Sequence, residues 1–571
     1  MLARTATCAL VVAAAACGEP GGVTVVTIRA RPAVKAVERI DVTLANAATT
    51  QTERFTIDGR AFPLTFSVET RDRDGDLTIS NDAEDTAGAT IASGATTVAI
   101  DPGASTTAEV TIEPHDFGVN TIFLGDQALA FRADSAGRQV AVSPDGIATI
   151  GWSDSCAVAG RCDVFGRRFD ATGTAVVTAA AAGDGQFTVN QTDGLIGFEP
   201  SLATNADGVT LAVWSDGTDL LAVAFDAAGA ALTPVETTIA AATQPSTPAV
   251  TALPTGRFVV TWTEDGATGG TFAVKARHVE ATGLVGINPI AGNTAAYTVS
   301  TTAVTARTPP AIVALGDAGA HAIVWRVDTA VRGRFYNPAG QPRTATDQVL
   351  AGYAPTDSLG EPLVTRVEGD IVIAFARRTA PGGDADTGQV VLRRLTPMIQ
   401  RVGVDGLATR DVGLRPVALT ARPDGAIAAA WEACMADGDG AGCGVRMQVF
   451  RPTLAPVGPS RLINTTTANN QLEPSLAPLP DGAFIAAWSD GSGVAPDRDG
   501  FGIRARILYP PYDDARGVLG ARCTATAECG ADAVCMPGSD DQPRCYRTCT
   551  AGACPSGGTC TTLGTESGCL F

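Results

Sequence analysis

The chain has few of the residues on which common catalytic motifs depend. It contains three histidines, His115, His278 and His321, which are widely separated in the sequence. It has no His-Glu-Xaa-Xaa-His segment, no Gly-Xaa-Ser-Xaa-Gly turn and no glycine-rich phosphate-binding loop. The sequence therefore assigns no catalytic residue, and it predicts no cofactor and no metal site.

Segments that favour helices are also scarce. No long stretch rich in Leu, Glu and Lys shows a helical period, whereas the chain has 63 glycines, 34 prolines and abundant Val and Thr. This composition is typical of many short strands joined by turns. We expect an all-β protein.

Basic residues are also fewer than acidic ones. The 41 basic residues face 60 acidic ones, which gives a net charge of −19. Such a charge repels nucleic acid and anionic membrane surfaces. The sequence therefore predicts no nucleic-acid partner, and no membrane contact other than a lipid anchor.

The only prominent apolar run lies at the N-terminus and ends at Cys17. It is too short to span a bilayer and is typical of a signal sequence over residues 1–17. The tetrapeptide that ends at Cys17 resembles the lipobox of bacterial lipoproteins, although Ala14 stands where Leu is usual. This resemblance implies acylation of Cys17 and an exported protein, lipid-anchored in the outer membrane or on the cell surface. The alternative is ordinary signal cleavage nearby, with Cys17 unmodified.

The cysteine count agrees with export. Of the 14 cysteines, Cys8 leaves with the signal and Cys17 carries the lipid, so an even number remains. They are grouped closely, as expected for disulfides formed outside the cytoplasm. The disulfide candidates are Cys156, Cys162, Cys434, Cys443, Cys523, Cys529, Cys535, Cys545, Cys549, Cys554, Cys560 and Cys569.

Three domains are expected after the signal. Short runs of alternating apolar and polar residues over 22–114 predict an immunoglobulin-like β-sandwich, followed by a linker at 115–118. Residues 119–510 contain a repeated unit, discussed next, and 511–521 form a second linker. Residues 522–571 hold two four-cysteine units of similar spacing, which resemble small extracellular Cys-rich repeats and predict a duplicated disulfide-rich module.

The central repeat predicts a seven-bladed β-propeller. Each copy has an apolar strand A, a Gly-containing turn, and a strand B that ends in an aromatic residue. A loop, a strand C, a turn and a strand D follow. The last copy stops after strand C, so we expect the segment that begins at Asn120 to pair with residues 501–508 and close the ring. The seven aromatic residues are Trp152, Trp214, Trp262, Trp325, Phe375, Trp431 and Trp488.

These repeats resemble those of large exported bacterial proteins and lipoproteins, in which strands of the Phe-Val-Val-Thr-Trp type (here residues 258–262) recur. The resemblance covers most of the central domain. It implies the fold and the exported location, and it implies almost nothing about chemistry.

In such blades the B-to-C loops and the D-to-A connections share one face, which we call the looped face. The pairs Cys156/Cys162 and Cys434/Cys443 lie in equivalent B-to-C loops. A disulfide in a long loop lowers the entropy lost on binding, which suits a recognition surface. The alternative is that the bridges only stabilise two long hairpins.

Acidic residues follow the blade aromatic in most copies. A ring of them at the funnel mouth would attract a cation or a basic ligand. The alternative is structural ion pairs with arginines of strand C, for which Arg168, Arg277, Arg334, Arg394 and Arg506 hold one aligned position. The candidate residues of the binding face are Asp154, Asp216, Asp265, Asp328, Glu432 and Asp490.

Two acidic loops are weaker calcium candidates. The segments Asp72-Arg-Asp74-Gly-Asp76 and Asp497-Arg-Asp499-Gly place carboxylates at alternate positions, but neither completes a calcium-binding loop, so solvated turns are expected. Overall the sequence favours a cell-envelope binding or adhesion module with an envelope or extracellular protein or polysaccharide as its partner. The alternatives are a carbohydrate-active hydrolase or lyase with a carboxylate site at the funnel, and a structural envelope protein without ligand.

Overall fold

Every regular element in the part of the chain that the structure describes is a β-strand, which confirms the predicted all-β class. The computed structural model describes residues 22–71, 74–101, 103–121, 125–129, 138–154, 163–177, 183–192, 197–241, 244–246, 248–266, 269–316, 318–379, 388–410, 417–434, 438–509, 533–537, 543–549, 559–563 and 566–570. Two compact units are present, residues 1–116 and residues 117–571. The predicted signal sequence and Cys17 lie outside the described residues. Within the described ranges, no helix is long and apolar enough to cross a membrane.

The first unit contains seven strands in the order β3-β2-β5-β6-β7-β1-β4. They are β1 (Gly22–Ala30), β2 (Arg39–Ala45), β3 (Thr50–Thr56), β4 (Leu64–Arg71), β5 (Gly75–Glu84), β6 (Thr90–Ile100) and β7 (Ser105–Pro114). β1 runs parallel to β7, and only two residue pairs join β6 to β7. Alternate residues of β1, β2, β5 and β7 are buried in one apolar cluster, as the two-residue period of a strand requires. The immunoglobulin-like class of this unit stays a prediction.

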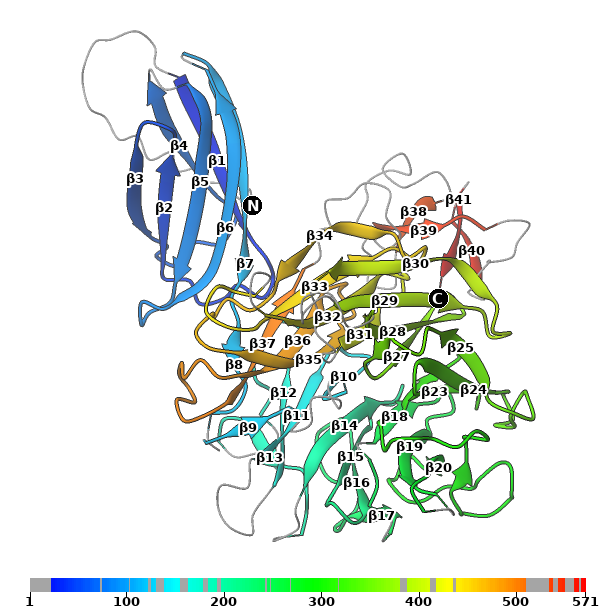
Figure 1. Cartoon of the computed structure of the whole chain (residues 1–571). Helices are drawn as coiled ribbons and strands as arrows, with labels where there is room; N and C mark the ends of the chain where they lie inside the picture. Colours follow the sequence, from blue (N-terminus) through cyan, green and yellow to red (C-terminus); the bar gives the residue numbers. More distant parts are fainter. Residues whose placement is uncertain are drawn as a thin grey trace. The chain divides into compact units, whose positions relative to one another are not determined.

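The second unit contains a seven-bladed β-propeller (Figure 1). Blades 1 to 3 comprise β10 (Val140–Val142), β11 (Ala148–Asp154), β12 (Val164–Phe169), β13 (Gln186–Thr188); β14 (Phe198–Thr204), β15 (Thr210–Ser215), β16 (Leu220–Phe225), β17 (Thr237–Ala240); and β18 (Ala249–Ala252), β19 (Phe258–Asp265), β20 (Phe272–Val279), β21 (Tyr297–Thr298). A short strand, β9 (Gln127–Ala128), also pairs with β11.

Blades 4 to 7 follow the same plan (Figure 1). They comprise β22 (Ala311–Ala314), β23 (His321–Val327), β24 (Ala330–Tyr336), β25 (Gln348–Gly352); β26 (Ser358–Leu359), β27 (Leu363–Val367), β28 (Asp370–Arg378), β29 (Gly388–Leu395), β30 (Arg401–Arg410); β31 (Val417–Ala421), β32 (Ile427–Ala433), β33 (Gly444–Phe450), β34 (Pro456–Leu462); and β35 (Gln471–Pro478), β36 (Phe484–Asp490), β37 (Gly502–Leu508), β8 (Phe117–Gly118).

The predicted aromatic residue of each blade lies in its second strand, or in the third strand, β28, of the five-stranded blade 5, and it is almost wholly buried. Phe375 and Trp431 are 0% exposed, and Trp262 is 1% exposed. Blades bury their faces only against their neighbours, so a large side chain at this position fills the space between adjacent sheets. The assignment of Phe375 as the aromatic residue of a diverged fifth copy is therefore correct.

The N-terminal strand closes the ring, but it is not the strand that the sequence predicts. β8 pairs antiparallel with β37, Phe117 opposite Ala505 and Gly118 opposite Arg504, so residues 117 and 118 are not a linker. Asn120 already ends this strand, because its side-chain oxygen accepts a hydrogen bond from the Ile503 N–H at 2.7 Å. The predicted pairing partner, residues 501–508, is right, and the closing strand lies three residues earlier than expected.

Two further hairpins lie in the C-terminal tail: β38 (Ala533–Pro537) with β39 (Pro543–Arg547), and β40 (Thr559–Leu563) with β41 (Glu566–Leu570). Their registers place Cys535 opposite Cys545 and Cys560 opposite Cys569. These are the third and fourth cysteines of the two predicted units, so the hairpins occupy equivalent places in both. Cys535 and Cys549 each take part in a disulfide. The cysteines at 523, 529 and 554 lie outside the described residues, and the duplicated module stays a prediction.

Candidate functional site

Four blades end in a short motif that ties strand D to strand C. Its third residue is Asn or Ser, and the side-chain oxygen accepts a hydrogen bond from the N–H of a strand C residue. Asn190 accepts from Val164 at 2.9 Å, and Asn464 accepts from Val445 at 2.9 Å. The motif can be recognised in the sequence as Gly118-Val-Asn120, Thr188-Val-Asn190, Thr298-Val-Ser300 and Leu462-Ile-Asn464.

The arginines of strand C join neighbouring blades, although not as predicted. The register places Phe165 opposite Trp152 and Val391 opposite Phe375, so Arg167 and Arg393 align with Arg277, Arg334 and Arg506. All five guanidinium groups donate to a main-chain oxygen of the preceding blade or its outgoing connection. The acceptors are Val119, Leu350, Ile239, Val299 and Ile463, respectively. These hydrogen bonds go to main-chain oxygens, whereas the sequence predicted ion pairs between the aligned arginines and the acidic residues after the aromatic.

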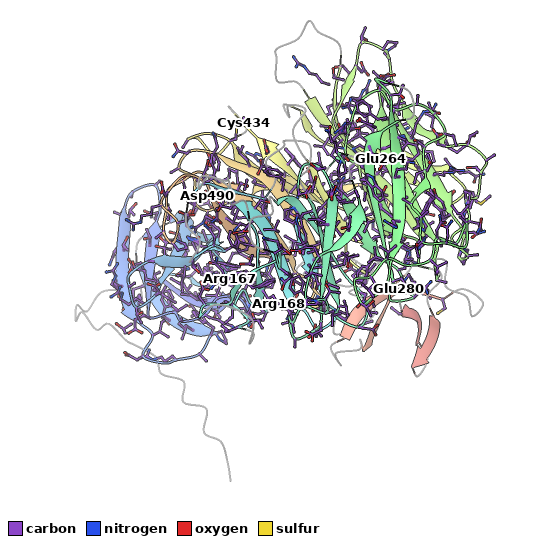
Figure 2. The ribbon with its side chains drawn as sticks, turned by 90° about the horizontal axis from the view of Figure 1, so that it is seen from below. Arg167, Arg168, Glu264, Glu280, Cys434 and Asp490 are labelled. Carbon is purple, nitrogen blue, oxygen red and sulfur yellow. A yellow bond between two sulfur atoms is a disulfide. The ribbon has the colours of Figure 1, made fainter. Side chains whose placement is uncertain are left out.

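Arg168 and Arg394, which the sequence alignment chose, lie one residue further along their strands. Adjacent strand residues point to opposite faces of a sheet, so they reach the following blade instead. Arg168 donates to the Ala227 oxygen at 2.8 Å and Arg394 donates to the Pro452 oxygen at 2.7 Å. Arg167 and Arg168 thus hold blade 1 on both sides (Figure 2).

The acidic candidates of the binding face do not form a ring of free carboxylates. Asp216 accepts from the N–H groups of Thr218 and Asp219 in its own turn. Glu432, 2% exposed, accepts from the Glu473 N–H at 2.8 Å, and Asp490, 3% exposed, accepts from the Gln471 side chain at 3.1 Å.

The other members are engaged locally as well. Asp265 pairs with Arg307, and Asp328 accepts from the Thr305 hydroxyl at 2.9 Å. Asp154 lies at the end of β11, where its N–H donates to the Asp163 oxygen. Glu264, adjacent to Asp265, accepts from the indole of Trp262 at 2.7 Å and belongs to a different blade from Asp490 (Figure 2). The carboxylates of the five candidates other than Asp154, and of Glu264, therefore serve turns and contacts between or within blades.

A central cavity of about 120 Å³ is lined by residues on or next to one inner strand from each of blades 1 to 6, namely β10, β14, β18, β22, β27 and β31. Its lining is mainly aliphatic and includes Val140, Leu202, Ile312 and Leu419. Among the described residues that line it, Arg138 is the only charged one and none is a carboxylate. No group of three or more His, Cys, Asp or Glu side chains in the described ranges is placed to hold a metal ion. The described lining of this cavity therefore contains no acid-base pair.

The disulfide between Cys434 and Cys443 forms as predicted, with the sulfurs 1.99 Å apart. The Cys443 N–H donates to the Asn470 side chain at 3.0 Å, and the Cys443 oxygen accepts from the Gln471 N–H at 2.7 Å. The loop that this bridge closes is therefore attached to the connection from blade 6 to blade 7. The equivalent pair Cys156/Cys162 lies outside the described residues.

Three further hydrogen bonds join this loop and the segments beside it. The Asn464 amide donates to Asp439 at 3.1 Å and to Gln471 at 3.1 Å, and the Gly491 N–H donates to the Asn470 oxygen at 2.8 Å. Gly440, Ala441, Asn469 and Asn470 are exposed above these contacts. We call the described residues 438–443, 464–470 and 491–500 the blade 6–7 platform.

No family model matches the chain, and no curated protein matches it. Among solved structures, a protein of unknown function from Dyadobacter fermentans has a TM-score of 0.38 at 10% identity and covers 68% of this chain and 99% of its own. The α-L-arabinofuranosidase Arb93A of Fusarium graminearum has a TM-score of 0.35 at 11% identity, covering 54% of this chain and 91% of its own. The NanB sialidase of Streptococcus pneumoniae has a TM-score of 0.37 at 8% identity, covering 83% and 95%. Similarity at this level carries no argument about a site or an activity.

Proposed function

We propose that the chain is a non-enzymatic binding module of the bacterial cell envelope, and that the blade 6–7 platform contacts a protein or polysaccharide ligand. The observation that carries this proposal is the attachment of the disulfide loop to blade 7. A loop that is already ordered loses little entropy when a ligand binds, so its contacts contribute more fully to affinity. The Cys434–Cys443 bridge, the Asn470 side chain and the Asn464 amide supply that order at residues 438–443, and they leave Gly440 and Ala441 exposed at the loop tip.

The shape and composition of the tip fit a contact surface. A Cβ added to Gly440 would meet nothing within 4 Å, so the tip is open to an approaching ligand. Asn469 and Asn470 are exposed beside it. The Asn470 side-chain oxygen accepts from the Cys443 N–H at 3.0 Å and the Asn469 amide donates to the Gly491 oxygen at 3.0 Å. An amide has two donor hydrogens and an oxygen with two lone pairs, so each side chain keeps further positions for hydrogen bonds to a ligand. The net charge of −19 disfavours polyanionic ligands, which leaves neutral or basic surfaces of a protein or polysaccharide.

A carbohydrate-active hydrolase is the alternative. Some solved structures that resemble the chain carry glycosidase names, but their TM-scores are below 0.5. Glycoside hydrolysis needs two carboxyl groups facing one sugar ring. The carboxylates of Asp216, Asp265, Asp328, Glu432 and Asp490 serve structural contacts. The described lining of the central cavity has no carboxylate. Binding without hydrolysis is therefore the better proposal.

The test uses one substitution at the tip and a matched one elsewhere. Ala441→Arg places a large side chain on the platform, where residue 441 is exposed. Ala339→Arg makes the same change at an exposed turn on the opposite face of blade 4. The soluble chain from residue 22, which begins after the predicted signal and Cys17, is presented to isolated envelope protein and polysaccharide fractions. We expect Ala441→Arg to lose at least about 10-fold in affinity, a change of about 1.4 kcal/mol, with Ala339→Arg unchanged.

The same fractions are assayed for released reducing sugar. Release of reducing sugar by the wild-type chain would contradict binding without hydrolysis and support the hydrolase alternative. Equal loss of affinity in both variants, or none in Ala441→Arg, would remove the platform from the proposal. Absence of any ligand in every fraction would favour a structural envelope protein.

We further propose that Cys17 anchors the protein by a lipid. The apolar run before it and its resemblance to a lipobox support this, together with the even number of cysteines that remain. Mass spectrometry of the N-terminal peptide of the native protein should find acyl chains on Cys17. A free or disulfide-bonded Cys17 would contradict the anchor.

A further inference from the structure

Two of the three histidines meet between blades 3 and 4. His278 lies on β20 and is 4% exposed, and His321 begins β23 and is 0% exposed. Their ring centroids are 5.9 Å apart. The His321 ring also stacks on Tyr336 at 4.3 Å, with the planes 8° apart. Far-separated sequence positions thus form one buried aromatic cluster across a blade boundary.

The hydrogen bonds of His321 require a neutral imidazole. His321 Nδ1 lies 2.8 Å from the Gly319 carbonyl, so this nitrogen carries the proton and donates. His321 Nε2 is then the acceptor for the Tyr297 hydroxyl at 3.2 Å. A second proton on Nε2 would remove that acceptor. His278 Nε2 is buried without a hydrogen-bond partner among the described residues.

The charged groups around the pair do not offset an added positive charge. Arg257, in the turn before β19, raises the positive potential at His278, and its own partner is Glu280 at 2.9 Å. Arg334 on β24 acts on the two tyrosines, Tyr297 and Tyr336, which are buried and neutral. Among the described residues, the charged and titratable groups that face the pair are therefore two arginines, one carboxylate already paired with Arg257, and two phenols.

We infer that the contact between blades 3 and 4 is an acid-sensitive seam, which opens when His278 and His321 are protonated while the other blades stay folded. A buried charge without a partner is costly, and a second one 5.9 Å away adds repulsion. Opening lets both imidazoles reach water. It stays local because each blade packs only against its neighbours.

The direction of the pH dependence follows from the burial. Burial and Arg257 lower the pKa of His278 to about 4. Burial lowers the pKa of His321 to about 3, with a further lowering by His278, against a hydrogen bond to Gly319 that raises it. The open state regains an ordinary value of about 6.5, so it binds more protons below that pH. Protonation of each histidine then increases the equilibrium constant for opening of the seam by about 10²-fold between pH 7 and pH 4.5.

Hydrogen exchange of the whole protein from about pH 7 to about pH 4.5, corrected for intrinsic rates, tests this inference. Strands β20 and β24 report on the seam, and β36 in blade 7 is the internal reference. We expect exchange at the seam to rise by at least about 100-fold relative to β36. An equal rise in all blades would overturn the inference, whatever the variants do.

Substitution identifies the groups responsible. The double variant His278→Gln/His321→Gln keeps polar side chains but cannot take up a proton in this range, so it should lose the acid response. His115→Gln is the matched control, because His115 lies in the first unit, where it contacts the Ser93 hydroxyl at 2.9 Å. A double variant that opens in acid as the wild type does would overturn the inference. If the double variant does not fold at neutral pH, the single variant His278→Gln is measured instead. The rise in hydrogen exchange of β20 and β24 between pH 7 and pH 4.5 should then be about 10²-fold smaller than in the wild type. An unchanged rise would overturn the inference.

Discussion

Replacing Asp347 with Asn should weaken the contact between blades 3 and 4 without changing its shape. The Asp347 side chain is 0% exposed and lies 2.7 Å from Arg332. It also accepts hydrogen bonds from the N–H groups of Thr301 at 2.8 Å and Thr302 at 2.9 Å, and from the Thr301 hydroxyl. Asp347→Asn removes the negative charge, and one amide orientation that keeps the backbone bonds turns an NH₂ toward Arg332.

The expected loss is about 2 kcal/mol. Breaking a buried ion pair costs about 3–5 kcal/mol when the remaining charge has no access to water. Arg332 is 22% exposed and recovers part of its hydration, which lowers that figure. Charge-assisted hydrogen bonds, each worth about 1.5–3 kcal/mol, become ordinary ones worth about 1 kcal/mol.

The pH dependence has a defined sign. Burial raises the pKa of Asp347, but hydrogen bonds from Thr301, Arg332 and Thr302 outweigh it and bring the pKa down to about 2. The folded state therefore favours the ionised form of Asp347 more strongly than the unfolded state does. Its contribution is present above about pH 4 and is lost as the pH falls toward 2, so Asp347→Asn should lose this acid-dependent part.

Tryptophan fluorescence is the suitable assay, because all six tryptophans lie in the propeller and none in the first unit. Urea unfolding should show a lower midpoint for Asp347→Asn with an unchanged slope. Asp328→Asn on the same blade is the control. Asp328 accepts only a side-chain bond from the exposed Thr305, so its replacement should cost less than about 0.5 kcal/mol. Equal midpoints for the two variants would refute the reasoning.

Three further changes test the ring. Arg506→Met leaves the Ile463 carbonyl without its guanidinium donor and should cost about 1–2 kcal/mol in the same urea assay, and a neutral result would remove these arginines from the account. Phe117→Ala deletes an aromatic ring whose centroid lies 5.1 Å from that of Phe169, where β8 closes the ring of blades. We expect the free energy of unfolding to fall by about 2–4 kcal/mol, and an unchanged value would show that closure does not depend on β8. Replacing Cys434 and Cys443 with Ser should lower stability by about 2–3 kcal/mol and speed hydrogen exchange in the loop between them, whereas unchanged exchange would show that the hydrogen bonds alone order it.

The propeller was predictable because its signal is repeated. The large aromatic at the end of strand B, with a glycine turn before it, recurs even where Phe375 replaces Trp. Register was harder, because a slip of one residue moves every side chain to the opposite face. Such a slip in the sequence alignment is the reason that Arg168 and Arg394 were predicted at the position that Arg167 and Arg393 occupy. The closing strand was misplaced for a related reason. Phe117-Gly-Val-Asn120 matches Phe187-Thr-Val-Asn190, whereas the predicted closing segment starts only at Asn120.

The candidate site was predictable only in outline. The sequence located the bridge between Cys434 and Cys443 and its place in a B-to-C loop. It did not show that Glu432 binds the backbone of Glu473, because the partner comes from the next blade and depends on how the two sheets pack. Acidic residues near a predicted funnel mouth therefore suggested a charged ring that the fold uses for other contacts. The Asn motif, which was visible in the sequence, is the signal that identifies the residues supporting the platform.

The most direct test of the proposed function is hydrogen-exchange mapping of the protein with and without the ligand recovered from the envelope fractions. The account predicts protection at residues 438–443, 464–470 and 491–500, and no change in the turns on the opposite face, such as residues 337–341. Protection confined to that opposite face, or to the outer strands, would contradict it.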